Sequence, residues 1–427
     1  MPVATARNVE ENAPLREQTH FRALRTSLAL GIFAIAGCGD ERSLELSLRV
    51  PALERSDVCV TAFSEGELVF AQSYPATAAT GTLTFVAGDR IDRSLHITAS
   101  LRRGGRSFAR EAGRAVFRAP GESQLELEPT RCVMLSSAPP ETLGTVAADA
   151  ALFAVDLDGD GNEEVLASSA SIAIVGAGEI DDSLGATPVA AADIDGDCRP
   201  ELIVTTSAGT VAFPSRAPLG SATLLAAVGD AGRGQELALA DEAGLRWGAL
   251  GGEARTLTGD IVRTLVVADF NGDDLDDLAA ASEEGVNVFF GGAGGPAAVL
   301  GATPSDWRGH HLAVGDFDGD GAPDLALADD AEVRVARNRG DGFFEARASL
   351  PIVATELRVV DANRDCRADL VILGDRPQIY LGGDDLAFQG GPLLENVADA
   401  VAADIDGDGA SELILRSPTG EVRTWAP

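Results

Sequence analysis

Aspartates recur from residue 156 onward in short loops where acidic and small residues alternate. In the loop DFDGDGAPD, Asp316, Asp318, Asp320 and Asp324 occupy positions 1, 3, 5 and 9, and Ala322 at position 7 can offer its backbone carbonyl. Ca²⁺ prefers six to eight oxygen ligands from carboxylates, carbonyls and water. Glycine at positions 4 and 6 permits the backbone conformations that wrap a tight loop around an ion. The spacing therefore predicts a calcium site.

The loop occurs in seven copies, which we number 1 to 7 along the chain. Six copies begin at Asp156, Asp193, Asp269, Asp316, Asp361 and Asp404, and the degenerate copy 3 runs from about Val228 to Glu236. Without a cation, carboxylates held a few ångströms apart would repel each other, which would raise their pKa values or open the loop. Solvated polar turns would explain one such loop, whereas six loops with acids in phase indicate metal binding.

Short apolar runs flank each loop, and neither flank has helical spacing. The loops lie 35 to 47 residues apart, which leaves room for four short strands per repeat. Such repeats are typical of the blades of a β-propeller, so seven copies predict seven blades. Because only two strands follow loop 7, we expect the segment 132–136 to supply the missing strand, so that the two ends of the propeller meet in one blade.

The repeats resemble FG-GAP repeats, also called VCBS-type repeats, which build integrin-α-like propellers. The resemblance is carried by the D-x-D-G-D-G-x-x-D/E loops and by hairpin sequences such as FFGGAGG at 289–295 and NRGDGFF at 338–344, and it covers residues 143–427. It implies an all-β chain with a seven-bladed propeller over residues 138–427. It also implies calcium in the loops and a propeller face that binds a ligand.

The resemblance further implies the ligands of up to six Ca²⁺ ions, with side-chain oxygens at positions 1, 3, 5 and 9 and a backbone carbonyl at position 7. The implied ligands are Asp156, Asp158, Asp160, Asn162 and Glu164; Asp193, Asp195, Asp197, Arg199 and Glu201; Asp269, Asn271, Asp273, Leu275 and Asp277; Asp316, Asp318, Asp320, Ala322 and Asp324; Asp361, Asn363, Asp365, Arg367 and Asp369; and Asp404, Asp406, Asp408, Ala410 and Glu412.

Three loops depart from the family's pattern. Copy 3 keeps only Asp230 and Glu236, so we expect no metal there. Cys198 and Cys366 replace the position-6 glycine of loops 2 and 6. Arg364 also replaces the position-4 glycine of loop 6, so this loop departs furthest from the pattern among the six expected sites.

The start of the chain has the features of an export signal. Arginines precede an apolar run from Leu28 to Ala36, which is too short to cross a bilayer as a helix. The run leads into Ile35-Ala36-Gly37-Cys38, which resembles a bacterial lipobox. We therefore expect residues 1–38 to be a signal peptide that ends at a lipidated Cys38. Gly39 resembles the residue after the cysteine in lipoproteins exported to the outer membrane, so we expect an envelope location that faces the periplasm or the cell surface.

Residues 39–137 have the pattern of a small β-sandwich. Leucines alternate with polar residues from Leu44 onward, which predicts a half-buried strand. Further strand-like runs, separated by Gly, Pro and Asp, bring the total to about seven. Export permits disulfides, and we expect Cys59 and Cys132 to pair within this domain. The pattern does not decide whether Cys198 and Cys366 are paired.

The net charge and the available side chains exclude some classes of function. A formal charge of −34 should repel nucleic acid. The sequence shows no nucleophile elbow or ordered catalytic triad. We therefore expect a non-catalytic binding, adhesion or structural module that recognises a protein or glycan and reaches a membrane through its lipid anchor. The alternative is a hydrolase or lyase acting on polysaccharide, which would use a pair of carboxylates outside the metal loops.

Overall fold

A computed structural model describes strand segments in the N-terminal region and most of the chain after residue 134. The described residues are 33–35, 43–49, 57–64, 67–75, 80–86, 94–103, 106–116, 135–136, 138–160, 162–181, 187–193, 197–206, 209–213, 217–220, 225–229, 236–249, 254–273, 275–292, 297–299, 303–406 and 410–426. The expected lipidation site Cys38, the predicted disulfide partner Cys132 and the predicted ligands Asp195 and Asp408 lie outside them.

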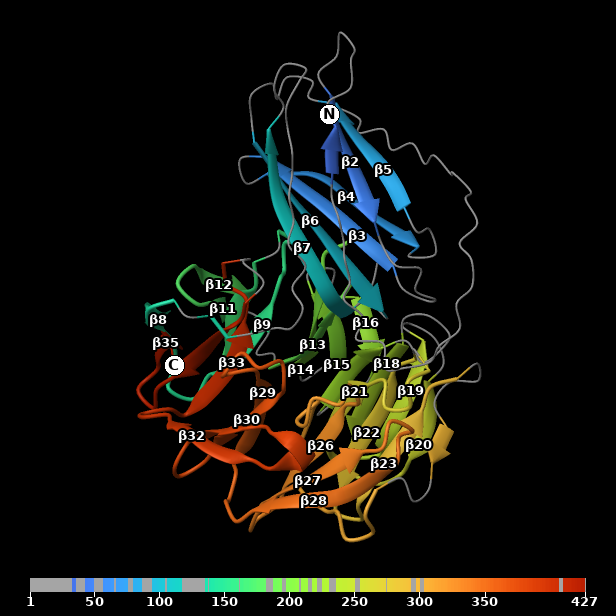
Figure 1. Cartoon of the computed structure of the whole chain (residues 1–427), viewed down its shortest axis with the longest axis vertical. Coiled ribbons are helices and arrows are strands. Elements are labelled where there is room, and N and C mark those ends of the chain that lie inside the picture. Colours follow the sequence, from blue (N-terminus) through green and yellow to red (C-terminus); the bar gives the residue numbers. More distant parts are fainter. Residues whose placement is uncertain are drawn as a thin grey trace.

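The N-terminal strands form two antiparallel sheets, drawn in blue and teal in Figure 1. A three-stranded sheet has the order β1-β2-β5, and a four-stranded sheet has the order β4-β3-β6-β7. The bounds are β1 (Phe33–Ile35), β2 (Ser43–Arg49), β3 (Asp57–Ser64), β4 (Glu67–Pro75), β5 (Thr80–Val86), β6 (Ser94–Arg103) and β7 (Arg106–Val116). β2 contains the alternating leucines from Leu44 onward, whereas β1 lies within residues 1–38, which the sequence assigned to a signal peptide.

Seven four-stranded antiparallel sheets follow, which we number 1 to 7 so that each carries the loop of the same number between its first two strands. Sheets 1 to 3 consist of β9 (Ala151–Val155), β10 (Glu164–Ser168), β11 (Ile172–Ile174) and β12 (Gly178–Asp181); β13 (Thr187–Ala192), β14 (Glu201–Thr206), β15 (Gly209–Phe213) and β16 (Ala217–Gly220); and β17 (Leu225–Gly229), β18 (Glu236–Asp241), β19 (Gly244–Ala249) and β20 (Ala254–Thr258).

Sheets 4 to 7 have the same arrangement. They consist of β21 (Val262–Ala268), β22 (Asp277–Ser282), β23 (Val286–Phe290) and β24 (Ala297–Val299); β25 (His311–Gly315), β26 (Asp324–Ala328), β27 (Val333–Asn338) and β28 (Phe344–Leu350); β29 (Glu356–Val360), β30 (Asp369–Leu373), β31 (Gln378–Leu381) and β32 (Gln389–Leu393); and β33 (Asp399–Ala403), β34 (Glu412–Arg416), β35 (Glu421–Trp425) and β8 (Thr142–Thr145).

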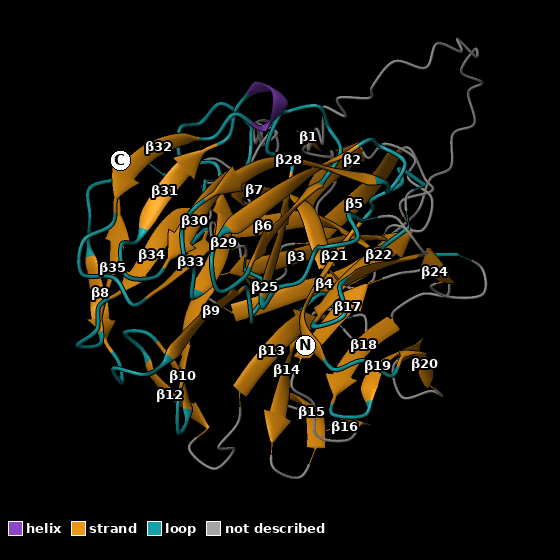
Figure 2. Cartoon of the chain, turned by 90° about the horizontal axis from the view of Figure 1, so that it is seen from below, coloured by secondary structure: helices purple, strands orange, loops and turns teal. Residues whose placement is uncertain are grey.

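The seven sheets follow one another in a circular arrangement, seen in Figure 2, in which first strands contact each other from sheet 2 round to sheet 1, and Leu166 and Leu202 pack sheet 1 against sheet 2. β13 contacts β17, and this pattern continues through β21, β25 and β29 to β33, which contacts β9 of sheet 1. The two ends meet in sheet 7, as the sequence predicted, but the strand is a different one. β8 pairs with β35 through Glu421 and Thr145, whereas Leu135, in the described part of the segment 132–136, forms an isolated bridge to Ser411.

The core lies between neighbouring sheets. The second strands of sheets 4 to 7 are buried along their whole length, because other sheets cover both of their faces. Between sheets 4 and 5, the rings of Phe270 and Phe344 meet edge to face with centroids 5.5 Å apart. Phe270 and Phe317 are position 2 of loops 4 and 5 and are buried. This apolar position therefore anchors each of these loops in the core.

Helix is nearly absent from the part of the chain that the structure describes. The one helical element there is the short 3₁₀ segment η1 (Asp384–Leu386). Within the same residues, no helix has both the length and the apolar character needed to cross a membrane.

Candidate metal centre

Each loop begins where the first strand of its sheet ends. The pairing of the first and second strands therefore fixes where the two ends of the loop lie. In sheet 5, Gly315 of β25 pairs with Asp324 of β26, and loop 5 spans the turn between them. Positions 1 and 9 are thereby held at the mouth of the turn. The intervening residues must fold back on themselves to join two adjacent strands, which brings positions 1, 3 and 5 together.

Loop 5 is wrapped around its own acidic side chains. Asp316 Oδ1 accepts hydrogen bonds from the amides of Gly319 (2.8 Å) and Asp320 (3.0 Å), and its Oδ2 accepts one from Gly321 (2.9 Å). Gly319 and Gly321 have φ of +77° and +92°, a region that favours glycine. Carboxylate oxygens of Asp316, Asp318 and Asp320 lie within 4.8 Å of one another. Three oxygens at this spacing could supply part of the six to eight oxygen ligands that Ca²⁺ prefers.

Loops 1 and 7 bring together a different set of acids. Oxygens of Asp156, Asp158 and Glu164 lie within 4.8 Å of one another, as do those of Asp404, Asp406 and Glu412. In these loops position 9 is glutamate, and it takes part in the acidic group. In loop 5 position 9 is the shorter aspartate, and the group there consists of positions 1, 3 and 5.

Aspartate at position 9 has a second role that the sequence pattern did not reveal. Asp277 Oδ2 accepts from the amide of Phe270 (2.8 Å), and its Oδ1 accepts from the amide of Gly291 (2.7 Å), just beyond β23. Asp369 makes the same pair of bonds with Ala362 (2.8 Å) and Gly382 (2.7 Å). The residue thus ties the start of the loop to the third strand of its sheet. The recurrence of an acid at position 9 was the only feature of the sequence that could have indicated this role.

Burial dominates the electrostatics of these acids. It raises the pKa of Glu164, Asp277 and Asp324 to about 7 and that of Asp369 to about 6, and repulsion from neighbouring carboxylates adds to the effect. Burial likewise raises the pKa of the position-1 or position-3 acids Asp158, Asp316, Asp318 and Asp361. The sequence argument named repulsion, but desolvation is the larger cause. A bound dication would favour the ionised forms, so these residues fit calcium.

Arg337 of β27 supplies a positive charge beside loop 5. Its guanidinium lies 3.0 Å from Asp318 Oδ2 and 2.7 Å from Asp320 Oδ2. The third strand of the sheet therefore contributes to the charge balance of the loop. Nothing in the nine-residue loop pattern indicated this residue.

The loops without glycine at positions 4 or 6 keep the same backbone shape. Cys198, Arg364 and Cys366 adopt φ of +72°, +63° and +65°. The amide of Cys366 still donates to Asp361 Oδ2 (2.8 Å), as Gly321 does to Asp316 in loop 5. A non-glycine residue in this region costs about 1–2 kcal/mol. These loops therefore pay a conformational cost to keep the wrapped form.

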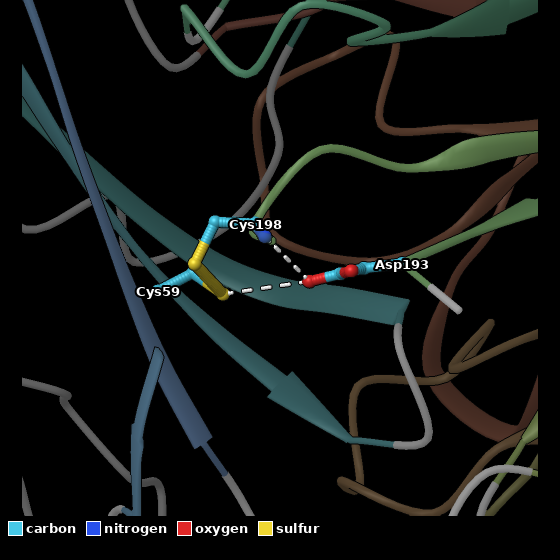
Figure 3. A group of neighbouring side chains, drawn as sticks. All are labelled: Cys59, Asp193 and Cys198. Atoms are coloured by element: carbon cyan, nitrogen blue, oxygen red, sulfur yellow. Dashed lines mark hydrogen bonds between the residues drawn. A yellow bond between two sulfur atoms is a disulfide. The ribbon is translucent and has the colours of Figure 1, made fainter. Parts of the chain in front are cut away.

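The predicted pairing of Cys59 with Cys132 is wrong. Cys59 of β3 forms a disulfide with Cys198 of loop 2, with Cα atoms 5.4 Å apart. Figure 3 shows both beside Asp193, whose Oδ2 accepts from the Cys198 amide at 2.9 Å. The pairing depends on how the N-terminal sheet docks on sheet 2, which no local pattern reveals. Cys366 is also disulfide-bonded.

Among the described residues of loops 2 and 4, the predicted ligands form no group of three carboxylates within 4.8 Å of one another. In loop 4, Asp269 Oδ1 accepts from the amide of Gly272 (2.8 Å), and Asp273 Oδ1 accepts from that of Leu275 (2.9 Å). In loop 2, Asp197 forms an ion pair with Arg199. In loop 3, where no metal was expected, Glu236 is buried at the start of β18.

Residues 269–327 and 316–372 match the family described as FG-GAP-like repeat. This part of the chain consists of FG-GAP-like repeats. The matched residues contain loops 4, 5 and 6, so the FG-GAP-like repeats that the sequence predicted are confirmed here. A search of curated proteins found no significant match to the sequence.

Solved structures of low sequence identity resemble the chain. BBS1N in complex with ARL6DN is 13% identical, with a TM-score of 0.48, and the match covers 70% of this chain and 98% of that one. A lectin of Agrocybe aegerita that recognises non-reducing terminal N-acetylglucosamine is 16% identical (TM-score 0.42; 73% and 93% covered). The Vibrio cholerae biofilm matrix protein Bap1 is 12% identical (TM-score 0.45; 93% and 91% covered). At these scores the likeness carries no argument about function.

Proposed function

We propose that the chain is an exported, lipid-anchored, calcium-binding module with a seven-bladed FG-GAP-type β-propeller and a small N-terminal β-sandwich. It binds a protein or glycan at the cell envelope and is not an enzyme. Loops 1, 2, 4, 5, 6 and 7 hold calcium, and loop 3 does not. The lipid on Cys38 attaches the chain to the membrane, facing either the periplasm or the cell surface.

The observation that carries the calcium proposal is the repeated convergence of acidic oxygens at one place in the sheets. Three carboxylates lie within 4.8 Å of one another in loops 1, 5 and 7. Random surface acids would not recur at the same turn of three different sheets. A divalent ion would offset both the burial of these acids and their mutual repulsion.

Thermal unfolding in calcium and in chelator tests this proposal. We expect the melting temperature to rise between excess EGTA and millimolar Ca²⁺, because an ion that binds only the folded state stabilises it by mass action. Magnesium at the same concentration is the control, since it is smaller and requires near-octahedral coordination. Equal melting temperatures in calcium and EGTA would refute calcium binding.

Lipid attachment and ligand binding need separate tests. Expression of the chain with a radiolabelled fatty acid should label the wild type but not Cys38→Ser. For the ligand, glycan and protein arrays should give binding without turnover of any polysaccharide. Hydrolysis or lyase cleavage of a glycan would replace the binding proposal with the enzymatic alternative.

A further inference from the structure

Strand β3 is buried on both faces of its sheet. The side chains on these two faces point in opposite directions, so each face needs its own cover. Val60 and Ala62 pair with Ala99 and Ile97 of β6, so these residues share one apolar, buried face. Cys59 and Thr61 alternate with them and must lie on the opposite face. They are also buried, at 3% exposure each. Something outside this sheet therefore covers the second face.

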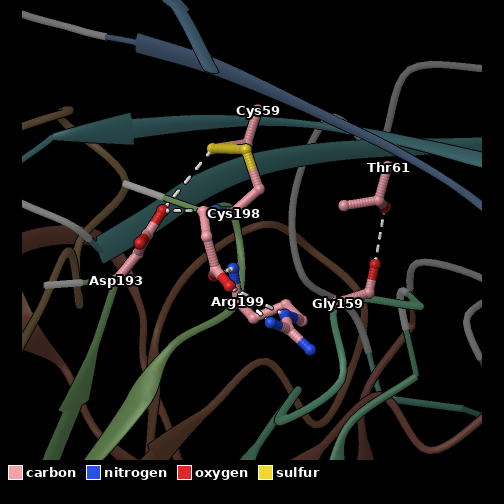
Figure 4. The surroundings of a disulfide bond; sticks show 7 residues. Cys59, Thr61, Gly159, Asp193, Cys198 and Arg199 are labelled. Atoms are coloured by element: carbon pink, nitrogen blue, oxygen red, sulfur yellow. Dashed lines mark hydrogen bonds and ion pairs between the residues drawn. A yellow bond between two sulfur atoms is a disulfide. The ribbon is translucent and has the colours of Figure 1, made fainter. Parts of the chain in front are cut away.

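The cover consists of loops 1 and 2. Cys59 is linked to Cys198 of loop 2 by the disulfide, and Thr61 Oγ1 donates to the carbonyl of Gly159 in loop 1 at 2.6 Å. Figure 4 shows the two contacts side by side, with Arg199 between the loops. One strand thus contacts two consecutive metal loops through residues two positions apart.

The contact reaches the predicted metal ligands directly. Cys59 Sγ lies 3.8 Å from Asp193 Oδ2, position 1 of loop 2. The disulfide consumes both thiols, so Cys59 and Cys198 do not offer thiolates to a metal. Gly159 is position 4 of loop 1, between the ligands Asp158 and Asp160, and its amide donates to Asp156 at 2.8 Å. A shift of β3 would therefore move backbone that shapes both sites.

Loop 6 also contacts a segment that lies N-terminal to the repeats. It shares the Asp-Cys-Arg sequence with loop 2, and its Cys366 is also disulfide-bonded. The amide of Leu135, which precedes the first repeat, donates to the carbonyl of Asp361 at 3.0 Å, and Arg364 Nε donates to the carbonyl of Leu135. Both Asp-Cys-Arg loops therefore hold segments that lie N-terminal to the repeats.

We propose that the outer face of β3 is a docking surface for loops 1 and 2, and that Ca²⁺ in these loops and docking of the N-terminal sheet stabilise each other. Cys59 and Thr61 are positioning residues for the two sites, acting through Cys198 and Gly159. Because linkage is reciprocal, calcium must strengthen docking by the same factor by which docking strengthens calcium binding. The inference rests on the proposed calcium binding.

Calcium titration calorimetry on the full chain tests the effect of docking on affinity. Thr61→Val removes the hydroxyl but keeps the shape, and we expect it to weaken one class of calcium site about fivefold, the effect of losing about one buried hydrogen bond. Thr61→Ser should restore wild-type affinity. Thr303→Val is the matched control, because Thr303 Oγ1 makes an equivalent bond to the carbonyl of Val286 (2.7 Å) outside the metal loops. It should leave the isotherm unchanged.

Hydrogen exchange tests the reverse direction. Amides of β3 should exchange more slowly in Ca²⁺ than in EGTA, and the double substitution Cys59→Ser with Cys198→Ser should enlarge that difference, because docking then loses its covalent link and depends more on calcium. Two results together would overturn this inference but leave the proposed function intact. Wild type and Thr61→Val would bind calcium with the same isotherm, and exchange of the β3 amides would not change with calcium. Absence of any calcium binding by the wild type would overturn both.

Discussion

Asp324, at the start of β26, accepts a hydrogen bond from the backbone amide of Asn338 at 2.8 Å, at the end of β27. Its other oxygen accepts from the amide of Phe317 at 3.2 Å. The carboxylate is fully buried and so satisfies two backbone donors that water cannot reach. Position 9 of the loop is thus a structural tie in addition to a predicted metal ligand.

This tie predicts different effects for two acids of the same loop. Asp324→Ala leaves two buried amides without acceptors and should lower the free energy of unfolding by about 2–4 kcal/mol in both calcium and EGTA. Asp320→Ala should lower it more in calcium than in EGTA, where the variant loses an exposed ion pair with Arg337 and a hydrogen bond from the Ala322 amide. Urea denaturation under both conditions measures the two effects. Equal, purely calcium-dependent losses would contradict the structural role of Asp324.

The raised pKa values predict an unusual pH dependence without calcium. Glu164, Asp277 and Asp324 have pKa values of about 7 in the folded chain, above the unfolded values of about 4. Between these limits the folded state holds more protons, so the free energy of unfolding falls as pH rises from about 4 to 7. Melting temperatures in EGTA should therefore decrease from pH 5 to pH 7.5.

Two controls separate this effect from the general repulsion of an acidic chain. Saturating calcium should reduce the decrease, because the ion favours the ionised carboxylates. Glu164→Gln, which cannot titrate, should reduce the slope in EGTA relative to wild type. A melting temperature in EGTA that increases over this pH range would show that burial does not raise these pKa values.

Two glycines at the same loop position should respond differently to alanine. Gly159 and Gly272 are position 4 of loops 1 and 4, with φ of +78° and +74°. A Cβ on Gly272 would meet nothing within 4 Å, whereas one on Gly159 would lie 3.2 Å from both the Cys198 carbonyl and Arg199 Cγ. Both alanine variants should lose about 1 kcal/mol from backbone strain, and Gly159→Ala should lose more. Chemical denaturation of the pair measures the difference, and equal losses would argue against tight packing at Gly159.

Arg337 should lower the calcium affinity of loop 5. Its guanidinium already balances Asp318 and Asp320, so it competes with an incoming cation. Arg337→Gln should tighten calcium binding several-fold at one site and destabilise the calcium-free chain. Arg347→Gln is the control, because Arg347 forms an ion pair with the exposed Glu345, outside the loops. Titration calorimetry distinguishes them, and weaker binding in Arg337→Gln would contradict competition.

Cysteine pairing can be read directly from peptides prepared without reduction. We expect one linked pair containing Cys59 and Cys198. The peptide with Cys366 should be linked to one carrying Cys38 or Cys132, the two cysteines that remain in the sequence; if Cys38 is lipidated as proposed, Cys132 is the one available. In a chain-entropy description, the Cys59–Cys198 link across 139 residues contributes about 4–5 kcal/mol. A Cys59–Cys132 peptide would contradict the structure.

Features confined to a few neighbouring residues could be predicted from the sequence. The acids of each loop, its flanking strands and the apolar residue at position 2 all lie within a dozen residues, where side-chain spacing reports directly on backbone geometry. Loop 5 accordingly lies between β25 and β26, where the pattern placed it. The FG-GAP-like nature of residues 269–372 follows from the same local repetition.

Relations across many residues were decided only by the tertiary structure. The sequence offered Cys132 as the partner of Cys59, but the docking of β3 on loop 2 brought Cys198 to it instead. Ring closure uses β8, because it is this segment that reaches the free edge of β35. Arg337 reaches loop 5 only because strand pairing sets β27 beside β26. Such contacts depend on how complete sheets pack, and packing is a property of the whole surface that each sheet buries, which no nine-residue pattern contains.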